Sequence, residues 1–299
     1  MPVARRYPMI LPGTPLVVAV SILAASNGFF AHWAYGDRAD ILAVLVGRAV
    51  GGLASALAIG VFARRHLPRR AELPVVALLG LILSSNAVTF FLAVRHLSPG
   101  TVTTVMYTYP ALVVAGSALL GWTKLSRWSV LSVGLALVGV VALIGLPADR
   151  PSTIGIVYSV ACAFSAAAYL LVAQVALRHT AATGAFAVAG TTSAIILISI
   201  AAAQGGPQAP AGVVGYSSLV GLGLLGTALA HTLLYRGIQL LGSARAAMIA
   251  PFEVIVVVAA SAVLLSTTVT WSSLVGAAFV LAGAVIGPMT TGTRHPERP

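Results

Sequence analysis

The stretch LPVVALLGLILSSNAVTFFLAVRH, residues 73–96, is apolar over most of its length. A helix needs about 20 apolar residues to cross a hydrocarbon core of about 30 Å, so this stretch predicts a membrane-spanning helix. Nine other stretches meet the same criterion. The ten predicted spans are residues 14–35, 40–63, 73–96, 99–121, 127–146, 154–178, 184–204, 212–236, 243–266 and 270–289.

The composition agrees with an all-α membrane protein. Of 299 residues, 59% are hydrophobic and 8% are charged, and the mean hydropathy is +1.01. A soluble domain carries roughly 25% charged residues, so a soluble enzyme and a disordered protein are excluded. A disulfide scaffold is excluded too, because Cys162 is the single cysteine.

The net charge of +11 has a topological explanation. Most basic residues lie between the apolar runs, as topology signals do, so we expect a lipid bilayer rather than nucleic acid as the partner. With the N-terminus inside, thirteen basic residues fall on the inner side and three, Arg38, Arg95 and Arg150, on the outer side. This predicts an inner (plasma) membrane protein with both termini cytoplasmic. Prolines follow Arg5 and Arg6 in the first apolar run, which favours an uncleaved first span.

An internal repeat divides the chain. A shift of 144 residues places Leu97 on Leu241 and Gly139 on Gly283. The halves, residues 1–149 and 150–299, hold five spans each. Because five is odd, the second half must be inverted in the membrane, and inverted repeats are typical of secondary transporters.

Several stretches carry a family resemblance. LAVRHLSP (92–99) and YPAL (109–112) come from the first half, and LGTALA (225–230), LLGSARAA (240–247), PFEV (251–254) and LVGAAFVLAG (274–283) from the second. In order and spacing they resemble the EamA-type members of the drug/metabolite transporter superfamily. The resemblance implies ten helices in two inverted five-helix repeats, and transport of a small metabolite, often efflux.

The resemblance further implies that spans 1, 3, 4, 6, 8 and 9 surround a cavity, while span 2 is peripheral. Amide, hydroxyl and aromatic groups in those spans can bind a small molecule. The alternative role for each is a hydrogen bond between helices. The predicted substrate-binding residues are Asn27, His32, Ser85, Asn86, Phe90, Thr104, Tyr107, Tyr109, Tyr169, His231 and Tyr235.

Two charged residues lie inside spans. An acidic group at mid-bilayer costs about 2.5–3.5 kcal/mol, so Glu253 is expected to be protonated, paired or in a wet cavity. Glu253 and His231 are therefore predicted proton-coupling groups, and a structural role for Glu253 beside Arg48 is the alternative. Arg48 is expected to be either a structural counter-charge or a contact for an anion.

Pro110 and Pro251 interrupt spans 4 and 9. A proline frees a carbonyl and permits a bend. We interpret both as hinge positions, with passive kinks as the alternative.

These features predict a secondary active transporter of a small organic molecule, amino-acid-like, drug-like or similar, most simply an exporter working by alternating access. An importer of the same fold, a non-transporting membrane protein and an intramembrane enzyme are the alternatives. The chain contains no H-E-x-x-H and no G-x-x-x-x-G-K-[ST] stretch, so we expect no enzyme activity, metal or cofactor. A monomer and a homodimer are both compatible with the sequence.

Overall fold

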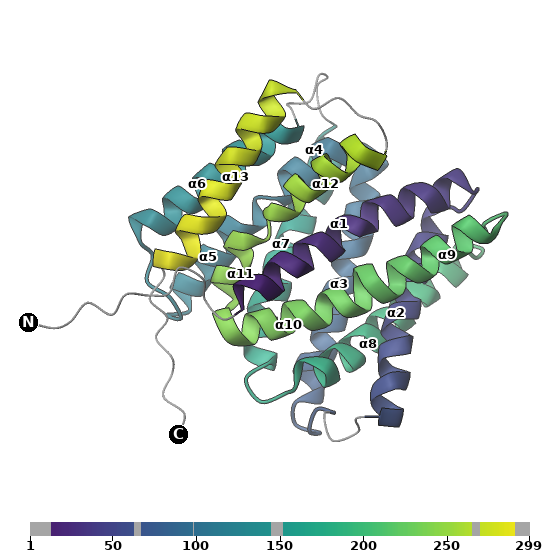
Figure 1. Cartoon of the computed structure of the whole chain (residues 1–299). Coiled ribbons are helices and arrows are strands. Elements are labelled where there is room, and N and C mark those ends of the chain that lie inside the picture. The colour runs from purple at the N-terminus through teal and green to yellow at the C-terminus, as the bar shows by residue number, and fades with distance from the viewer. Residues whose placement is uncertain (1–12, 63–66, 98, 145–151, 265–269, 291–299) are drawn as a thin grey trace, which may run out of the picture.

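The chain folds into a helical bundle (Figure 1). The computed structural model describes residues 13–62, 67–97, 99–144, 152–264 and 270–290. Within these residues the secondary structure is helical and contains no strand. The predicted tails, with Arg5, Arg6, Arg294 and Arg298, lie outside the described residues.

The helices follow one another with short connections. In chain order they are α1 (Thr14–Gly36), α2 (Ile41–Phe62), α3 (Leu73–Val94), α4 (Pro99–Met106), α5 (Tyr109–Leu119), α6 (Arg127–Ile144), α7 (Thr153–Ala176), α8 (Ala182–Ala203), α9 (Val213–Gly221), the π-helix η2 (Leu222–Leu229), α10 (Ala230–Leu241), α11 (Ser243–Ile249), α12 (Phe252–Leu264) and α13 (Trp271–Thr290).

These elements form the ten predicted spans. Eight helical stretches are long and apolar enough to cross a membrane, and the shorter apolar helices at 127–142 and 274–286 complete the set. Three spans are composite. Span 4 consists of α4 and α5, span 8 of α9, η2 and α10, and span 9 of α11 and α12. The ten-helix fold expected from the sequence is confirmed.

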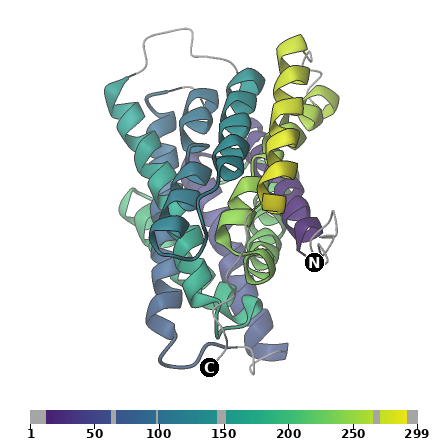
Figure 2. The same ribbon diagram turned by 90° about the vertical axis from the view of Figure 1, so that its left-hand side faces the viewer.

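The packing of the spans has the symmetry of an inverted repeat. Span 2 packs on span 7 (α2 on α8), span 4 on span 9 (α5 on α11) and span 5 on span 10 (α6 on α13). Span 1 packs on span 8 and span 6 on span 3. Exchanging each span with the one five places away leaves this set of pairs unchanged. Figures 1 and 2 both show the α6–α13 pair side by side.

Glycines bring the backbones of the two halves together along α2. A Cβ atom on Gly51 would overlap the Gly223 carbonyl oxygen of η2, and one on Gly52 would overlap the Gly190 carbonyl oxygen of α8. Helices in a membrane associate through close packing of small residues, because lipid is as apolar as the side chains. This glycine seam, Gly51–Gly223 and Gly52–Gly190, joins α2 to the second half of the chain.

Polar side chains join the halves at one end of the bundle. Asp37, just after α1, accepts hydrogen bonds from the backbone N–H groups of Gly212 (2.8 Å) and Gly215 (2.9 Å). Asp40 accepts from Gln208 N (3.1 Å) in the same connection. These bonds tie the connection after α1 to the one before α9.

Glu72 makes the corresponding link at the opposite end. Its carboxylate accepts from Arg69 N (2.9 Å) and from the Thr180 hydroxyl (2.9 Å) of the α7–α8 connection. Gln239 of α10 donates to the carbonyl oxygens of Leu177 (3.2 Å) and Thr180 (3.0 Å). Three segments of the chain therefore meet at this end: the connection before α3, the α7–α8 connection and α10. The backbone N–H of Arg69 and the Thr180 hydroxyl hold the pKa of Glu72 below its usual value.

The first prediction concerns the glycine seam. Gly52→Ala is expected to destabilise the protein by about 1–3 kcal/mol, the usual cost of overpacking, because the backbones of α2 and α8 must separate. The control is Gly134→Ala in α6, where an added Cβ meets no atom within 4 Å. Both changes gain the same helix propensity, so a lower melting temperature in detergent for Gly52→Ala alone confirms the seam. Equal melting temperatures would contradict it.

The second prediction concerns pH. Because the folded protein lowers the pKa of Glu72, the ionised carboxylate stabilises the fold above its ordinary pKa of 4.5, and this contribution is lost as the pH falls through the lower folded value. Glu72→Gln is therefore expected to lower the melting temperature at pH 7. The difference from wild type should shrink as the pH falls below 4.5. A difference independent of pH would show that Glu72 acts through its shape and not its charge.

Candidate functional site

A cavity of about 190 Å³ lies in the middle of the bundle, between the two halves. Seven spans contribute to its wall. The lining residues are Val17, Val20, Ser21, Ala24, Asn27, Arg48, Leu83, Asn86, Met106, Tyr107, Tyr109, Ala166, Tyr169, Leu170, Gly226, Ala230, His231, Leu234, Ala246, Ala250 and Glu253.

Two spans are interrupted at this cavity. In span 4, α4 ends at Met106 and α5 begins at Tyr109, with Pro110 in its first turn. In span 9, α11 ends at Ile249 and α12 begins at Phe252, so Ala250 and Pro251 lie in the gap. Residues beside both interruptions line the cavity. The hinge role of Pro110 and Pro251 remains a prediction.

The interruptions bring Glu253 and two tyrosines together. Glu253 lies in the first turn of α12 and accepts a hydrogen bond from the Tyr107 hydroxyl. The Tyr107 and Tyr109 rings are 6.0 Å apart. A carboxylate can accept several hydrogen bonds, so Glu253 keeps free acceptor capacity on the cavity side.

An aromatic cluster forms another wall. The Tyr169 hydroxyl of α7 donates to the Tyr235 hydroxyl of α10 (2.8 Å). The His231 ring stacks on Phe186 at 5.4 Å and meets Tyr169 edge-on at 5.8 Å. His231 Nδ1 is 2.8 Å from the Thr227 carbonyl oxygen. These contacts hold the imidazole and the Tyr169 ring in fixed orientations at the cavity.

The π-helix η2 shapes the wall next to α1. The Asn27 amide donates to the Gly226 carbonyl oxygen (3.0 Å), and a Cβ on residue 226 would overlap the Asn27 side chain. Asn27 Oδ1 is buried and, among the described residues, has no hydrogen-bond partner. An unsatisfied buried acceptor costs about 1–3 kcal/mol, and π-helices occur frequently at functional sites.

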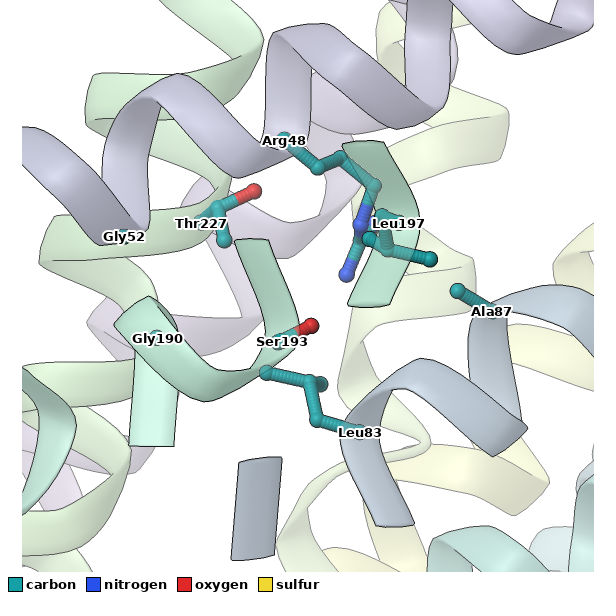
Figure 3. Close-up of a pocket in the computed structure, with 8 residues that line it drawn as sticks. All are labelled: Arg48, Gly52, Leu83, Ala87, Gly190, Ser193, Leu197 and Thr227. Atoms are coloured by element: carbon teal, nitrogen blue, oxygen red, sulfur yellow. The ribbon is translucent and has the colours of Figure 1, made fainter. Parts of the chain in front are cut away.

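Arg48 reaches the cavity from α2. Its side chain also borders a smaller cleft of about 10 Å³ between α2, α3, α8 and η2 (Figure 3). In this view the guanidinium end is turned toward the side of the cleft that holds the Ser193 hydroxyl. That hydroxyl accepts a hydrogen bond from Ser84 (3.0 Å). The cleft is about large enough for one water molecule.

Most of the predicted site residues meet at the cavity. Those that line it are Asn27, Asn86, Tyr107, Tyr109, Tyr169, His231, Glu253 and Arg48. Asn86 is fixed by α7, because its amide donates to the Cys162 carbonyl oxygen (3.0 Å). Tyr235 lies behind Tyr169 and is fully buried. Span 2, expected to be peripheral, therefore contributes a charged residue to the wall.

Four predicted residues lie elsewhere. His32 is exposed on α1, and Ser85 is exposed on α3 with its hydroxyl 3.4 Å from that of Ser165. Phe90 packs edge-on against Phe91 at 5.6 Å. Thr104 is not among the cavity-lining residues. These four are not among the residues that line the cavity, and their part in substrate binding stays a prediction.

The sequence reasoning missed the apolar part of the wall. Val17, Val20, Ala24 and Asn27 lie three or four residues apart and form one face of α1. Ser21 lines the cavity beside them, and its hydroxyl donates a hydrogen bond to the Val17 carbonyl oxygen (3.1 Å). Counting three or four residues at a time toward the N-terminus from Asn27 would have predicted this face from the sequence. Among the described residues, no group of three His, Cys, Asp or Glu side chains could hold a metal ion.

A central cavity between two halves, with interrupted helices beside it, is the architecture of secondary transporters. The sequence places the chain in a family of that class. The model of the EamA-like transporter family matches residues 11–145 and again residues 153–286. The chain therefore belongs to the EamA-like transporter family, within the drug/metabolite transporter superfamily.

Comparison with solved structures agrees on the fold. One crystal structure of a protein without further description aligns with a TM-score of 0.79 over 93% of this chain and 96% of the other. The two sequences are 18% identical, so the likeness shows the fold alone. No curated protein matches the chain.

The third prediction tests the aromatic wall. Tyr235→Phe removes the acceptor of the Tyr169 hydroxyl and is expected to cost about 1 kcal/mol of unfolding free energy. Tyr216→Phe, at an exposed position in α9, is the control and should change nothing. Thermal unfolding of the two purified variants measures the difference. Equal melting temperatures would mean that the tyrosine pair does not stabilise the wall.

Proposed function

We propose that the protein is a secondary active transporter that carries a small organic molecule across the membrane through the central cavity. The observation that carries this proposal is the cavity itself, which both halves line and which the interrupted spans 4 and 9 border. In alternating access, one half rocks against the other around a fixed midplane site. Family membership supports transport over the non-transporting and enzymatic alternatives.

The proposed orientation places the Glu72 end in the cytoplasm. Of the basic residues in the described connections, Arg69, Arg70, Lys124 and Arg178 lie on that side, and Arg38 and Arg95 lie on the other. Positive charge is retained on the cytoplasmic side during insertion. With this orientation, both termini are cytoplasmic and the membrane is the inner (plasma) membrane.

Glu253 is the proposed proton carrier, with His231 as a second proton-binding group on the cavity wall. A carboxyl group in a cavity inside the membrane can exchange a proton when the cavity opens to either side. Its carboxyl group accepts a hydrogen bond from Tyr107 of span 4, so a change in its protonation acts directly on a contact between the two halves. Export coupled to proton entry is the direction that we propose.

The fourth prediction tests this function in cells. Cells expressing wild type are expected to accumulate at least one metabolite in the medium that empty-vector cells do not. Glu253→Gln should abolish that accumulation, because the amide cannot carry a proton. Glu72→Gln, which makes the same change outside the cavity, should retain it at matched membrane levels. Untargeted mass spectrometry of medium and cytoplasm measures the outcome.

The other outcomes are distinct. Depletion of a metabolite from the medium by wild type would reverse the direction to import. Equal export by wild type and Glu253→Gln would leave transport intact and contradict the role of Glu253. No difference between wild type and empty vector, together with no flux of the cell's metabolite extract in proteoliposomes, would contradict transport.

A further inference from the structure

Two arginines at the Glu72 end of the bundle lie against tryptophan rings. The Arg178 guanidinium carbon, just after α7, is 5.7 Å from the centre of the Trp122 ring in the α5–α6 connection. The Arg127 guanidinium carbon, at the start of α6, is 5.4 Å from the centre of the Trp128 ring. The negative face of an indole ring attracts a guanidinium and orients it. The two tryptophans therefore hold both charges in place.

No carboxylate among the described residues neutralises these arginines. Glu72 is the one described carboxylate at this end, and it accepts from Arg69 N and the Thr180 hydroxyl. Arg178 lies two residues before Thr180, yet its guanidinium meets Trp122 and forms no ion pair with Glu72. The N–H groups of the guanidinium are therefore available to a ligand.

Lys124 places a third cation near the two arginines. It lies in the α5–α6 connection, two residues after Trp122, and all three cationic side chains are exposed. We call Lys124, Arg127 and Arg178 the basic cluster. The first two come from the first half of the chain and the third from the second half, so the cluster is complete only in the folded protein. Retention of positive charge during insertion explains the number of these cations, but it does not require two of them to be oriented on aromatic rings.

Exposed apolar side chains surround the basic cluster. They are Leu119, Leu120, Leu125, Trp128 and Val175. They belong to the ends of α5 and α7, to the α5–α6 connection and to the start of α6. In a membrane protein, exposed apolar side chains near the end of a span contact acyl chains, and tryptophan is enriched at the level of the headgroups. The basic cluster therefore lies at the depth of the lipid phosphates.

We propose that the basic cluster, Lys124, Arg127 and Arg178, is a binding site for the phosphate group of an anionic phospholipid, whose acyl chains lie against the exposed apolar side chains of α5 and α7. A guanidinium presents paired N–H groups that match phosphate oxygens, and a lysine adds a compact positive charge. The site is remote from the central cavity. It does not depend on what the protein transports.

The charge and the surroundings of the cluster select this occupant. Three cations without a described counter-charge favour a headgroup that carries a net negative charge. A phosphatidylcholine headgroup would bring a further cation to the cluster. A soluble phosphate would meet the cations but leave the apolar side chains around them uncovered. An anionic phospholipid satisfies both parts of the surface at once.

The test measures lipid binding to the purified full chain by native mass spectrometry. The protein in detergent is titrated with phosphatidylglycerol or with phosphatidylcholine of the same acyl chains, and glycerol 3-phosphate is the free-phosphate probe. The variants are Arg178→Gln and Trp122→Leu. Their matched controls are Arg70→Gln, at an exposed cation of the same end outside the cluster, and Trp271→Leu, at an exposed tryptophan of α13.

The expected result is a lipid preference that only the cluster variants lose. Wild type should bind the first phosphatidylglycerol about tenfold more tightly than the first phosphatidylcholine. Arg178→Gln should remove about tenfold of the affinity for phosphatidylglycerol and leave phosphatidylcholine unchanged, because a charge-assisted pair is lost. Trp122→Leu keeps every charge and should weaken phosphatidylglycerol by about threefold, because the guanidinium loses its orientation. Arg70→Gln and Trp271→Leu should bind both lipids as wild type does.

Three results would overturn the lipid site. The first is equal affinity of wild type for the two lipids. The second is an equal loss in Arg178→Gln and Arg70→Gln, which would mean that the number of charges at this end matters and their placement does not. The third is displacement of phosphatidylglycerol by glycerol 3-phosphate at equal concentration, which would make the cluster a site for free phosphate. An unchanged affinity in Trp122→Leu would contradict the role of the aromatic rings.

A charge-preserving variant keeps the proposal testable if Arg178→Gln inserts or folds poorly. Arg178→Lys retains the positive charge that insertion needs but lacks the paired N–H groups. It should melt as wild type does in lipid-free detergent and bind phosphatidylglycerol more weakly. An unchanged affinity would contradict phosphate recognition by the guanidinium. Because no step of this experiment involves transport, its failure would leave the transporter proposal unaffected.

Discussion

The hydrogen bonds of the backbone constrain this structure more than any other interaction. In a hydrocarbon core no water is available, so a spanning chain must satisfy its N–H and C=O groups within the protein, and helices do this most simply. Irregular backbone is tolerated only where protein or a water-filled cavity surrounds it. The interruptions at residues 107–108 and 250–251 obey this rule, since residues beside both line the cavity. The breaks in the helices of spans 4 and 9 therefore lie at the same place as the candidate site.

The sequence predicted the fold almost completely. Apolar length is a direct signal of a span, and the parity of two five-span halves is enough to require inversion. What the sequence did not predict is the π-helical register of residues 222–229. Residues in that register contact Asn27 and Gly51, which belong to spans distant in the sequence and cannot be read from the local pattern.

Residue type combined with helical periodicity is enough to predict which residues line the site. Asn27 and Asn86 were found from their polarity. His32 and Ser85 have the same polarity, but each lies one residue away from the cavity face, a rotation of about 100° on an α-helix. Residue type alone does not define a face. The sequence singled out Arg48 by its charge, but its place on the cavity wall became visible only in the structure, where the glycines of α2 contact the other half of the chain.

The exchange of partners between the halves has a consequence for biosynthesis. α1 packs mainly on α9, η2, α10 and α12, all from the second half, and makes little contact with α2. During translation, α1 leaves the ribosome first, yet the surface that it packs against is complete only after residue 264 has been made. Until then α1 and its half-polar face, with Ser21 and Asn27, must remain in lipid or against the insertion machinery. Tertiary assembly of this protein is therefore necessarily late, and the first half alone lacks the partners of its own first helix.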